Sequence, residues 1–157
     1  MKTNRVATTL TLRVFVVSFV ALAFSLGIMA SVWASDEQYG QLHITKDCVA
    51  YTGLAGGHCT IASSNLSEIP AGAIVYYDQA AGTPTGLLDS NVVLDAGHGD
   101  RAIGRCALDL STGLGLCTFS DGTGRLAGFA ARVNVSHLSG KLWAWDGTYR
   151  FSLKDDR

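Results

Sequence analysis

The sequence has little of what would mark a common enzyme or nucleic-acid-binding protein. Only two of its 157 residues are proline, and it contains no G-x-S-x-G motif, no P-loop and no C-x-x-C pair. These absences leave serine-hydrolase, P-loop and thiol-redox chemistry without a sequence signal. The four histidines, His43, His58, His98 and His137, show no H-x-H or H-x-x-x-H spacing. We therefore predict surface histidines, no metal site and no cofactor.

Acidic side chains suited to proton transfer are also few. After residue 34 the chain has only two glutamates, Glu37 and Glu68, and both fall in segments that read as a tail or a turn. All four cysteines have a plausible disulfide role, so none is a free nucleophile. The sequence therefore assigns no catalytic residue.

The N-terminus has the three parts of a secretory signal peptide. Lys2, Arg5 and Arg13 supply positive charge, residues 14–30 are an apolar run, and Val32-Trp33-Ala34 places small residues before the expected cleavage point. We predict a signal peptide over residues 1–34 and one secreted domain over residues 35–157, with no stable membrane insertion after cleavage. The alternative is an uncleaved membrane anchor, because the run approaches the length of a span.

Removing the predicted signal changes the charge of the chain. The whole sequence has 12 basic and 13 acidic residues, and three of the basic ones lie in the signal, which leaves a net charge of −4. A negative domain of this kind is a poor match for nucleic acid.

Four cysteines remain in the predicted mature domain. An even number in an exported chain indicates disulfides, although three pairings are open. Cys48 and Cys59 are eleven residues apart, as are Cys106 and Cys117, and both intervals are rich in glycine. We favour these two local pairs.

Short runs with alternating apolar residues recur along the domain, with turn signals between them and no long helical pattern. Such spacing predicts a β-sandwich or barrel, and 18 glycines suit tight turns and bends. We expect residues 35–40 to be a frayed start and residues 63–70 to form a capped single turn. The expected strands are 41–48, 58–62, 74–79, 87–94, 102–110, 114–120, 126–136 and 141–153.

The last of these strands carries the most chemical information. Its odd-numbered positions are mostly aromatic and its even-numbered ones mostly polar, so the aromatic face should point inward. An aromatic interior can bind an apolar ligand, but it can equally be a filled core. The glycine at position 147 favours a cavity or a bend. The candidate ligand-binding residues are Phe129, Val133, Trp143, Trp145, Tyr149 and Phe151.

The stretch from residue 106 to residue 136 reads as strand, turn, strand, Gly-rich turn and strand. Within it, GTGRLAGFAARVNV resembles the Gly-Thr-Gly-(Arg/Lys)-Phe-x-Gly turn and strand of the allene oxide cyclase and dirigent-like barrels. Residues 59–151 are similar to secreted bacterial proteins of this kind, which also end in a Trp-Asp-Gly-Thr-Tyr run, here Trp145 to Tyr149. The resemblance implies an eight-stranded antiparallel β-barrel of calycin type, here stapled by disulfides. It also implies that copies of the chain can associate into a homo-oligomer.

Three functions follow as hypotheses. The leading one is a secreted barrel that binds a small hydrophobic or aromatic ligand in its interior. The second is an isomerase or cyclase acting on a polyene, polyketide or fatty-acid-like substrate, as the resemblance implies. The third is a non-catalytic structural or interaction barrel with a filled core.

Overall fold

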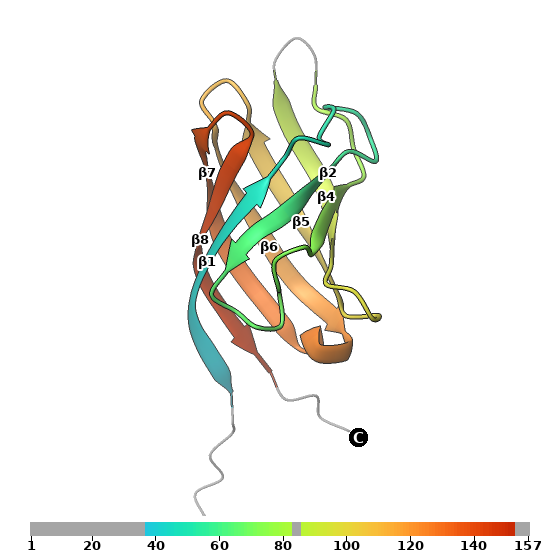
Figure 1. Ribbon diagram of the computed structural model, residues 1–157, viewed down its shortest axis with the longest axis vertical. Helices are drawn as coiled ribbons and strands as arrows, with labels where there is room; N and C mark the ends of the chain where they lie inside the picture. Colours follow the sequence, from blue (N-terminus) through green and yellow to red (C-terminus); the bar gives the residue numbers. More distant parts are fainter. Residues whose placement is uncertain (1–36, 83–85, 153–157) are drawn as a thin grey trace, which may run out of the picture. The chain divides into compact units, whose positions relative to one another are not determined.

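A computed structural model describes residues 37–82 and 86–152, which form a closed barrel of eight antiparallel strands (Figure 1). Each strand pairs with its neighbours in the sequence, and β8 pairs with β1 to close the wall. The all-β, eight-stranded antiparallel barrel predicted from the sequence is therefore confirmed. The strands are β1 (Gln38–Asp47), β2 (His58–Ser64), β3 (Ile74–Tyr77), β4 (Leu87–Asp95), β5 (Arg101–Asp109), β6 (Leu114–Thr123), β7 (Phe129–Ser139) and β8 (Leu142–Phe151).

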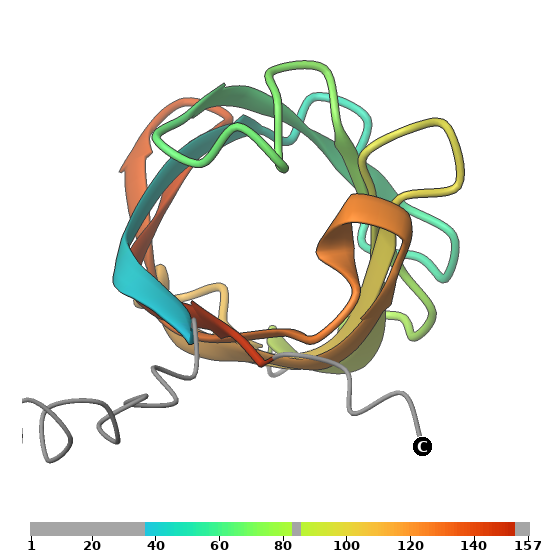
Figure 2. The ribbon, with the colours of Figure 1, turned by 90° about the horizontal axis from the view of Figure 1, so that it is seen from below.

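The two ends of the barrel are built differently. We call the end that carries the β1–β2, β3–β4, β5–β6 and β7–β8 connections the upper end, as it stands in Figure 1. The lower end carries the other connections, among them the 3-10 turn η1 (Gly124–Leu126) between β6 and β7. Figure 2 shows η1 projecting over part of the lower opening, and the side chain of Leu126 is fully buried there.

Alternation along the strands places the core inside the barrel. In β7, Phe129, Val133 and Val135 are buried, while Arg132 and Asn134 between them are exposed. The other strands contribute Leu, Ile, Val and aromatic side chains to the same interior. Removing this apolar surface from water is the main favourable term for folding, at about 25 cal/mol per Å².

Strand ends differ from the sequence expectation by one to three residues, and two strands start three residues away from the expected position. β1 begins at Gln38, inside the segment expected to fray, because its first residues pair in register with the end of β8. An exposed ion pair of 3.1 Å between Arg150 and Glu37 supports that pairing. β7 begins at Phe129 rather than at residue 126, because Leu126 belongs to η1.

The Gly-Thr-Gly-Arg turn is built around Asp100. One oxygen of its carboxylate accepts the backbone N–H of Arg125 at 2.9 Å, and the other accepts Nε of Arg125 at 2.6 Å. These two donors hold the pKa of Asp100 below its usual value. Gly124 has φ +60°, and a Cβ there would collide with the Asp100 carboxylate; a Cβ at Gly122 would collide with the Leu126 carbonyl. The motif therefore shapes the lower end of the barrel.

Both favoured disulfides are confirmed, Cys48–Cys59 and Cys106–Cys117. Cys106 and Cys117 are direct partners across β5 and β6, and Gly113 in the hairpin between them has φ +71°. Structural disulfides of this kind indicate an oxidising, extracellular-type environment. The predicted signal peptide lies outside the described residues, and its secretory role stays a prediction. In the described ranges, no helix is long and apolar enough to cross a bilayer.

Candidate functional site

A lysine side chain is buried inside the barrel near its upper end. Lys46 follows Leu42 and Ile44 along the inward face of β1 and is only 2% exposed. The pairing of β1 with β2 shifts register at this point, where Lys46 lies opposite Ile61 and Thr45 lies opposite Ser63. Bulges of this type often occur where a functional side chain is positioned.

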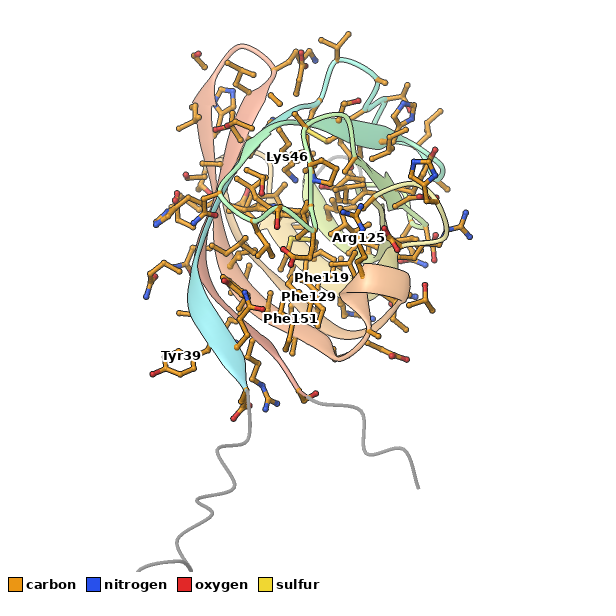
Figure 3. The ribbon with its side chains drawn as sticks, turned by 60° about the horizontal axis from the view of Figure 1, so that its bottom comes forward. Tyr39, Lys46, Phe119, Arg125, Phe129 and Phe151 are labelled. Carbon is orange, nitrogen blue, oxygen red and sulfur yellow. A yellow bond between two sulfur atoms is a disulfide. The ribbon has the colours of Figure 1, made fainter. Side chains whose placement is uncertain are left out.

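Aromatic groups surround the amine of Lys46. Its Nζ donates a hydrogen bond of 2.5 Å to the hydroxyl of Tyr77. The same nitrogen lies 4.5 Å from the centre of the Trp145 ring and 5.3 Å from the centre of the Tyr77 ring. The ring of Tyr51 packs edge-on against Tyr77, with their centres 5.2 Å apart. We call Lys46, Tyr51, Tyr77 and Trp145 the Lys46 cluster; Lys46 is labelled in Figure 3.

Electrostatics at the cluster disfavour a charged amine. Among the described residues, no carboxylate forms an ion pair with Lys46. Burial lowers the pKa of Lys46 to about 7, because the ammonium form loses its hydration more than the neutral amine does. Burial, and to a smaller extent the nearby Tyr51, raise the pKa of Tyr77, so this hydroxyl keeps its proton at neutral pH.

Two further polar groups of the cluster have unused hydrogen-bonding capacity. The hydroxyl of Tyr51 and Nε1 of Trp145 are both buried without a hydrogen-bond partner among the described residues. A buried polar group without a partner costs about 1–3 kcal/mol. Lys46 makes one hydrogen bond although an ammonium has three donors. The cluster can therefore make more polar contacts than it does.

A small cavity lies beside the amine. Its volume is about 20 Å³, enough for a single water molecule. The walls combine polar cluster members with aliphatic and aromatic side chains, and the Cys48–Cys59 disulfide forms one side. Its lining consists of Lys46, Cys48, Tyr51, Cys59, Tyr77, Leu88, Leu108, Leu110 and Trp143.

The upper end also carries exposed apolar side chains, which sit in or beside its four connections. Clusters of exposed apolar residues commonly mark places where an apolar molecule or partner binds. Here they surround the end of the barrel nearest the Lys46 cavity. These residues are Val49, Leu54, Leu87, Leu114, Leu138 and Leu142, which are 37–71% exposed.

The six candidate ligand-binding residues predicted from the sequence all lie on the inward faces of β7 and β8, at different levels of the barrel. Trp143 lines the Lys46 cavity, and Trp145 contacts Lys46 on one side. On the other side its ring packs 5.4 Å from that of Phe119. Trp145 therefore links the upper part of the interior to the lower.

Aromatic rings pack against one another in the lower part of the interior. The ring of Phe129 lies 6.1 Å from that of Phe119 and 5.3 Å from that of Phe151, and Figure 3 shows the three close together. Tyr149 packs edge-on against Phe151 at 5.9 Å. Gly147 opens no space, because the backbone of β7 at Arg132 occupies the position a Cβ would take. The ligand-binding role of Phe129, Val133, Tyr149 and Phe151 stays a prediction.

A second, larger depression of about 640 Å³ is open to solvent and is lined by residues of β1, β6, β7 and β8. Its lining includes the buried Phe119 and the predicted ligand-binding residue Tyr149. Two of its charged side chains, Arg132 and Arg150, are exposed, and Arg150 already pairs with Glu37. Exposed groups of this kind remain hydrated and orient a ligand weakly. The Lys46 cluster is therefore the stronger candidate site, although its cavity is far smaller.

Reasoning from the sequence found Trp145 but missed the other three members of the cluster, Lys46, Tyr51 and Tyr77. Leu42 and Ile44 occupy alternate, inward-facing positions of β1, and the same alternation places position 46 inside the barrel. A lysine at an inward-facing position was therefore the one signal in the sequence that could have indicated the site. Tyr77 and Tyr51 gave no comparable signal, since they join Lys46 from β3 and a connecting loop. In residues 37–82 and 86–152, no three His, Cys, Asp or Glu side chains are arranged to hold a metal ion.

Comparisons of the chain with protein-family models, with curated proteins and with solved structures found no match. The resemblance to allene oxide cyclase and dirigent-like barrels therefore stays a prediction from the sequence.

Proposed function

We propose that the barrel binds a small, largely apolar or aromatic molecule at its upper end, and that an oxygen group of this ligand contacts Lys46 and Tyr77. The observation that carries the proposal is the buried amine of Lys46, which lies among aromatic rings and has no carboxylate partner in residues 37–82 and 86–152. An unpaired buried amine is costly for folding, so a binding role gives a reason for its position.

The chemistry of the cavity matches such a ligand. Leu88, Leu108 and Trp143 offer apolar contact, while the amine of Lys46 and the hydroxyl of Tyr51 offer polar contact. Ligand sites in proteins commonly combine mostly apolar walls with a few convergent polar groups. The exposed leucines of the upper end would favour the approach of an apolar molecule.

Ligand entry requires the cavity to widen, since about 20 Å³ holds only one water molecule. Tyr51 and Trp143 are its half-buried aromatic walls and can move outward with the least loss of packing. Tyr51 lies in the loop that begins at Cys48, and the Cys48–Cys59 disulfide anchors this loop to β2. The side chain of Tyr51 can therefore move while its loop stays anchored.

The test is a comparison of three probes of similar shape: cinnamyl alcohol, cinnamate and the hydrocarbon β-methylstyrene. Binding is followed by quenching of tryptophan fluorescence, because Trp143 and Trp145 border the cavity or the amine. We expect the two oxygen-bearing probes to bind more tightly than the hydrocarbon. The double variant K46M/Y77F should lose this preference, and K141M, which alters an exposed lysine, should keep it.

Two results would contradict the proposal. One is that none of the three probes binds to the oxidised protein. The other is that K46M/Y77F binds the oxygen-bearing probes as tightly as the unmodified protein does, which would move the site away from Lys46.

A further inference from the structure

The Lys46 amine has the surroundings of a reactive nucleophile. It is buried, it contacts the hydroxyl of Tyr77 at 2.5 Å, and among the described residues it has no ion-pair partner. Lysines in apolar pockets form imines with carbonyl compounds because desolvation favours the neutral amine. We infer that Lys46 captures an apolar or aromatic aldehyde or ketone as a reversible imine. This inference rests on the proposed function, because the carbonyl compound must first enter the cavity.

The reaction balances with the groups present. The lone pair of Nζ attacks the carbonyl carbon, a C–N bond forms, and the oxygen takes up a proton to give a carbinolamine. Loss of water then gives the imine, so amine plus carbonyl compound yields imine plus one water. Addition of water reverses the step, and no oxidant or reductant is needed.

Tyr77 is placed to move the protons of this reaction. Its hydroxyl is in hydrogen-bond contact with Nζ, where a proton leaves the nitrogen and the departing oxygen gains one. General acid–base groups act at this distance. The unpaired hydroxyl of Tyr51, next to Tyr77, is a second group that can hydrogen-bond the oxygen of the carbinolamine.

Imine formation also removes an unfavourable charge. A neutral imine nitrogen accepts a hydrogen bond from the hydroxyl of Tyr77 and has no buried ammonium to stabilise. The lowered pKa of Lys46 agrees with this, since about half of the amine is neutral at pH 7. A lysine with the usual pKa is neutral in only about one molecule in 3,000 at that pH.

The groups that face Lys46 leave a simple pH dependence. β3 contributes Tyr77 and the β1–β2 loop contributes Tyr51, which are the titratable side chains besides Lys46 among the described residues that line the cavity. β8 contributes Trp143 and Trp145, and β2 contributes the disulfide-bonded Cys59, none of which titrates. Capture should therefore follow deprotonation of Lys46 itself and rise between pH 6 and pH 8.

The experiment treats the oxidised protein with trans-cinnamaldehyde at pH 7 and traps the imine with sodium cyanoborohydride. The trapped product has the mass of the protein plus the aldehyde less one oxygen atom. The sequence has lysines at positions 2, 46, 141 and 154, so peptide mapping identifies the modified one. We expect Lys46 to be labelled at least about tenfold faster than the exposed Lys141, since burial favours the neutral amine at position 46.

Matched variants complete the test. K46M should abolish the fast adduct, and K141M should leave it unchanged. Y77F keeps the amine and the ring but removes the hydroxyl, so it should slow trapping by a larger factor than it weakens the binding of cinnamyl alcohol, whose oxygen also contacts Tyr77 in the proposed site. If a variant does not fold, peptide mapping of the unmodified protein still tests the inference, because it shows directly which lysine is labelled.

The outcomes separate this inference from the proposed function. Cinnamyl alcohol that binds, with no preferential adduct from the aldehyde, overturns the imine and leaves ligand binding in place. Equal labelling of Lys46 and Lys141 also overturns it. Failure of both probes to bind or react overturns the inference and the proposed function together.

Discussion

The buried lysine gives the protein an unusual pH dependence of stability. The pKa of Lys46 is about 7 in the folded protein and 10.5 when the side chain is unperturbed. Between these values the unfolded chain holds a proton on Lys46 that the folded protein has released. Unfolding therefore takes up a proton, and the free energy of unfolding rises with pH across this window. Most proteins instead show a maximum of stability between about pH 5 and 8.

The size of the effect follows from the two pKa values. A shift of one unit corresponds to about 1.4 kcal/mol, so the whole difference amounts to about 5 kcal/mol. From pH 7 to pH 9 the expected gain is about 2 kcal/mol, because half of the amine is already neutral at pH 7. Above about pH 10 the raised pKa of Tyr77 acts in the opposite direction, since the unfolded tyrosine ionises first.

Urea unfolding of the oxidised protein at pH 7, 8 and 9, followed by tryptophan fluorescence, measures this gain. All four cysteines are in disulfides, so no thiol is present to exchange them at the higher pH. K141M should show the same rise as the unmodified protein. K46M/Y77F should show no change in the free energy of unfolding over this pH range. The variant also replaces Tyr77, because K46M alone would leave the buried Tyr77 hydroxyl without its hydrogen-bond donor.

The reasoning fails if the unmodified protein gains nothing between pH 7 and pH 9. It also fails if K46M/Y77F gains as much as the unmodified protein does, because the titrating group would then lie elsewhere. The slope of the free energy of unfolding against urea concentration should stay the same at the three pH values. The free energies are therefore compared from both slope and midpoint, because a changed slope would mean that the folded or unfolded state itself had changed.

Three further predictions concern the barrel wall. D100N should lower the urea midpoint at pH 7, because it weakens the contacts of Asp100 with Arg125. The unmodified protein should lose stability as the pH falls below about 4, because the pKa of Asp100 is depressed in the folded protein and protonation removes its stabilising contacts; D100N should lose less. G147A should cost about 1–3 kcal/mol in urea unfolding, since its methyl group meets the backbone of β7, and an unchanged midpoint would contradict the close approach. C106S/C117S should cost about 3 kcal/mol for a separation of 11 residues, measured by thermal or urea unfolding against the oxidised protein.

Much of the fold could be predicted because local patterns determine it. Strict alternation in residues 129–136 marks an inward and an outward face, and the structure has both. The paired cysteines and the turn between them fix the β5–β6 hairpin from within eleven residues. Eight such strands with short connections leave few arrangements besides a closed barrel.

The features of the fold that could not be predicted from the sequence depend on contacts between segments far apart in the chain. Residues 35–40 look too polar to form a strand, yet Gln38 pairs with Phe151 from the other end of the domain. Leu126 continues the apolar pattern of β7 but is drawn into η1 because Asp100, from another turn, binds Arg125. In both cases a partner far along the chain decides the local conformation.

The candidate site was hidden for the same reason. A lysine at position 46 reads as the polar end of a strand, and only closure of the barrel places it against Tyr77 and Trp145. The predicted aromatic residues were found because aromatic rings at alternate positions are a strong local pattern. The amine that gives those rings a chemical context comes from the opposite end of the domain.

The buried amine of Lys46 should lower the stability of the folded protein and strengthen the binding of oxygen-bearing ligands. These two opposite effects distinguish a ligand-binding barrel from a purely structural one. A barrel that only needed a filled core would be more stable with an apolar side chain here. Even replacing a buried ion pair with well-packed hydrophobic residues is often neutral or stabilises a protein by about 1–4 kcal/mol, and Lys46 has no ion-pair partner among the described residues to offset its burial. K46M/Y77F should therefore be more stable than the unmodified protein at pH 7 and should lose its preference for oxygen-bearing ligands. Greater stability with unchanged binding would mean that the amine serves neither folding nor the ligand. Lower stability would mean that Lys46 holds the core together through Tyr77, and its buried position would then be no argument for a ligand.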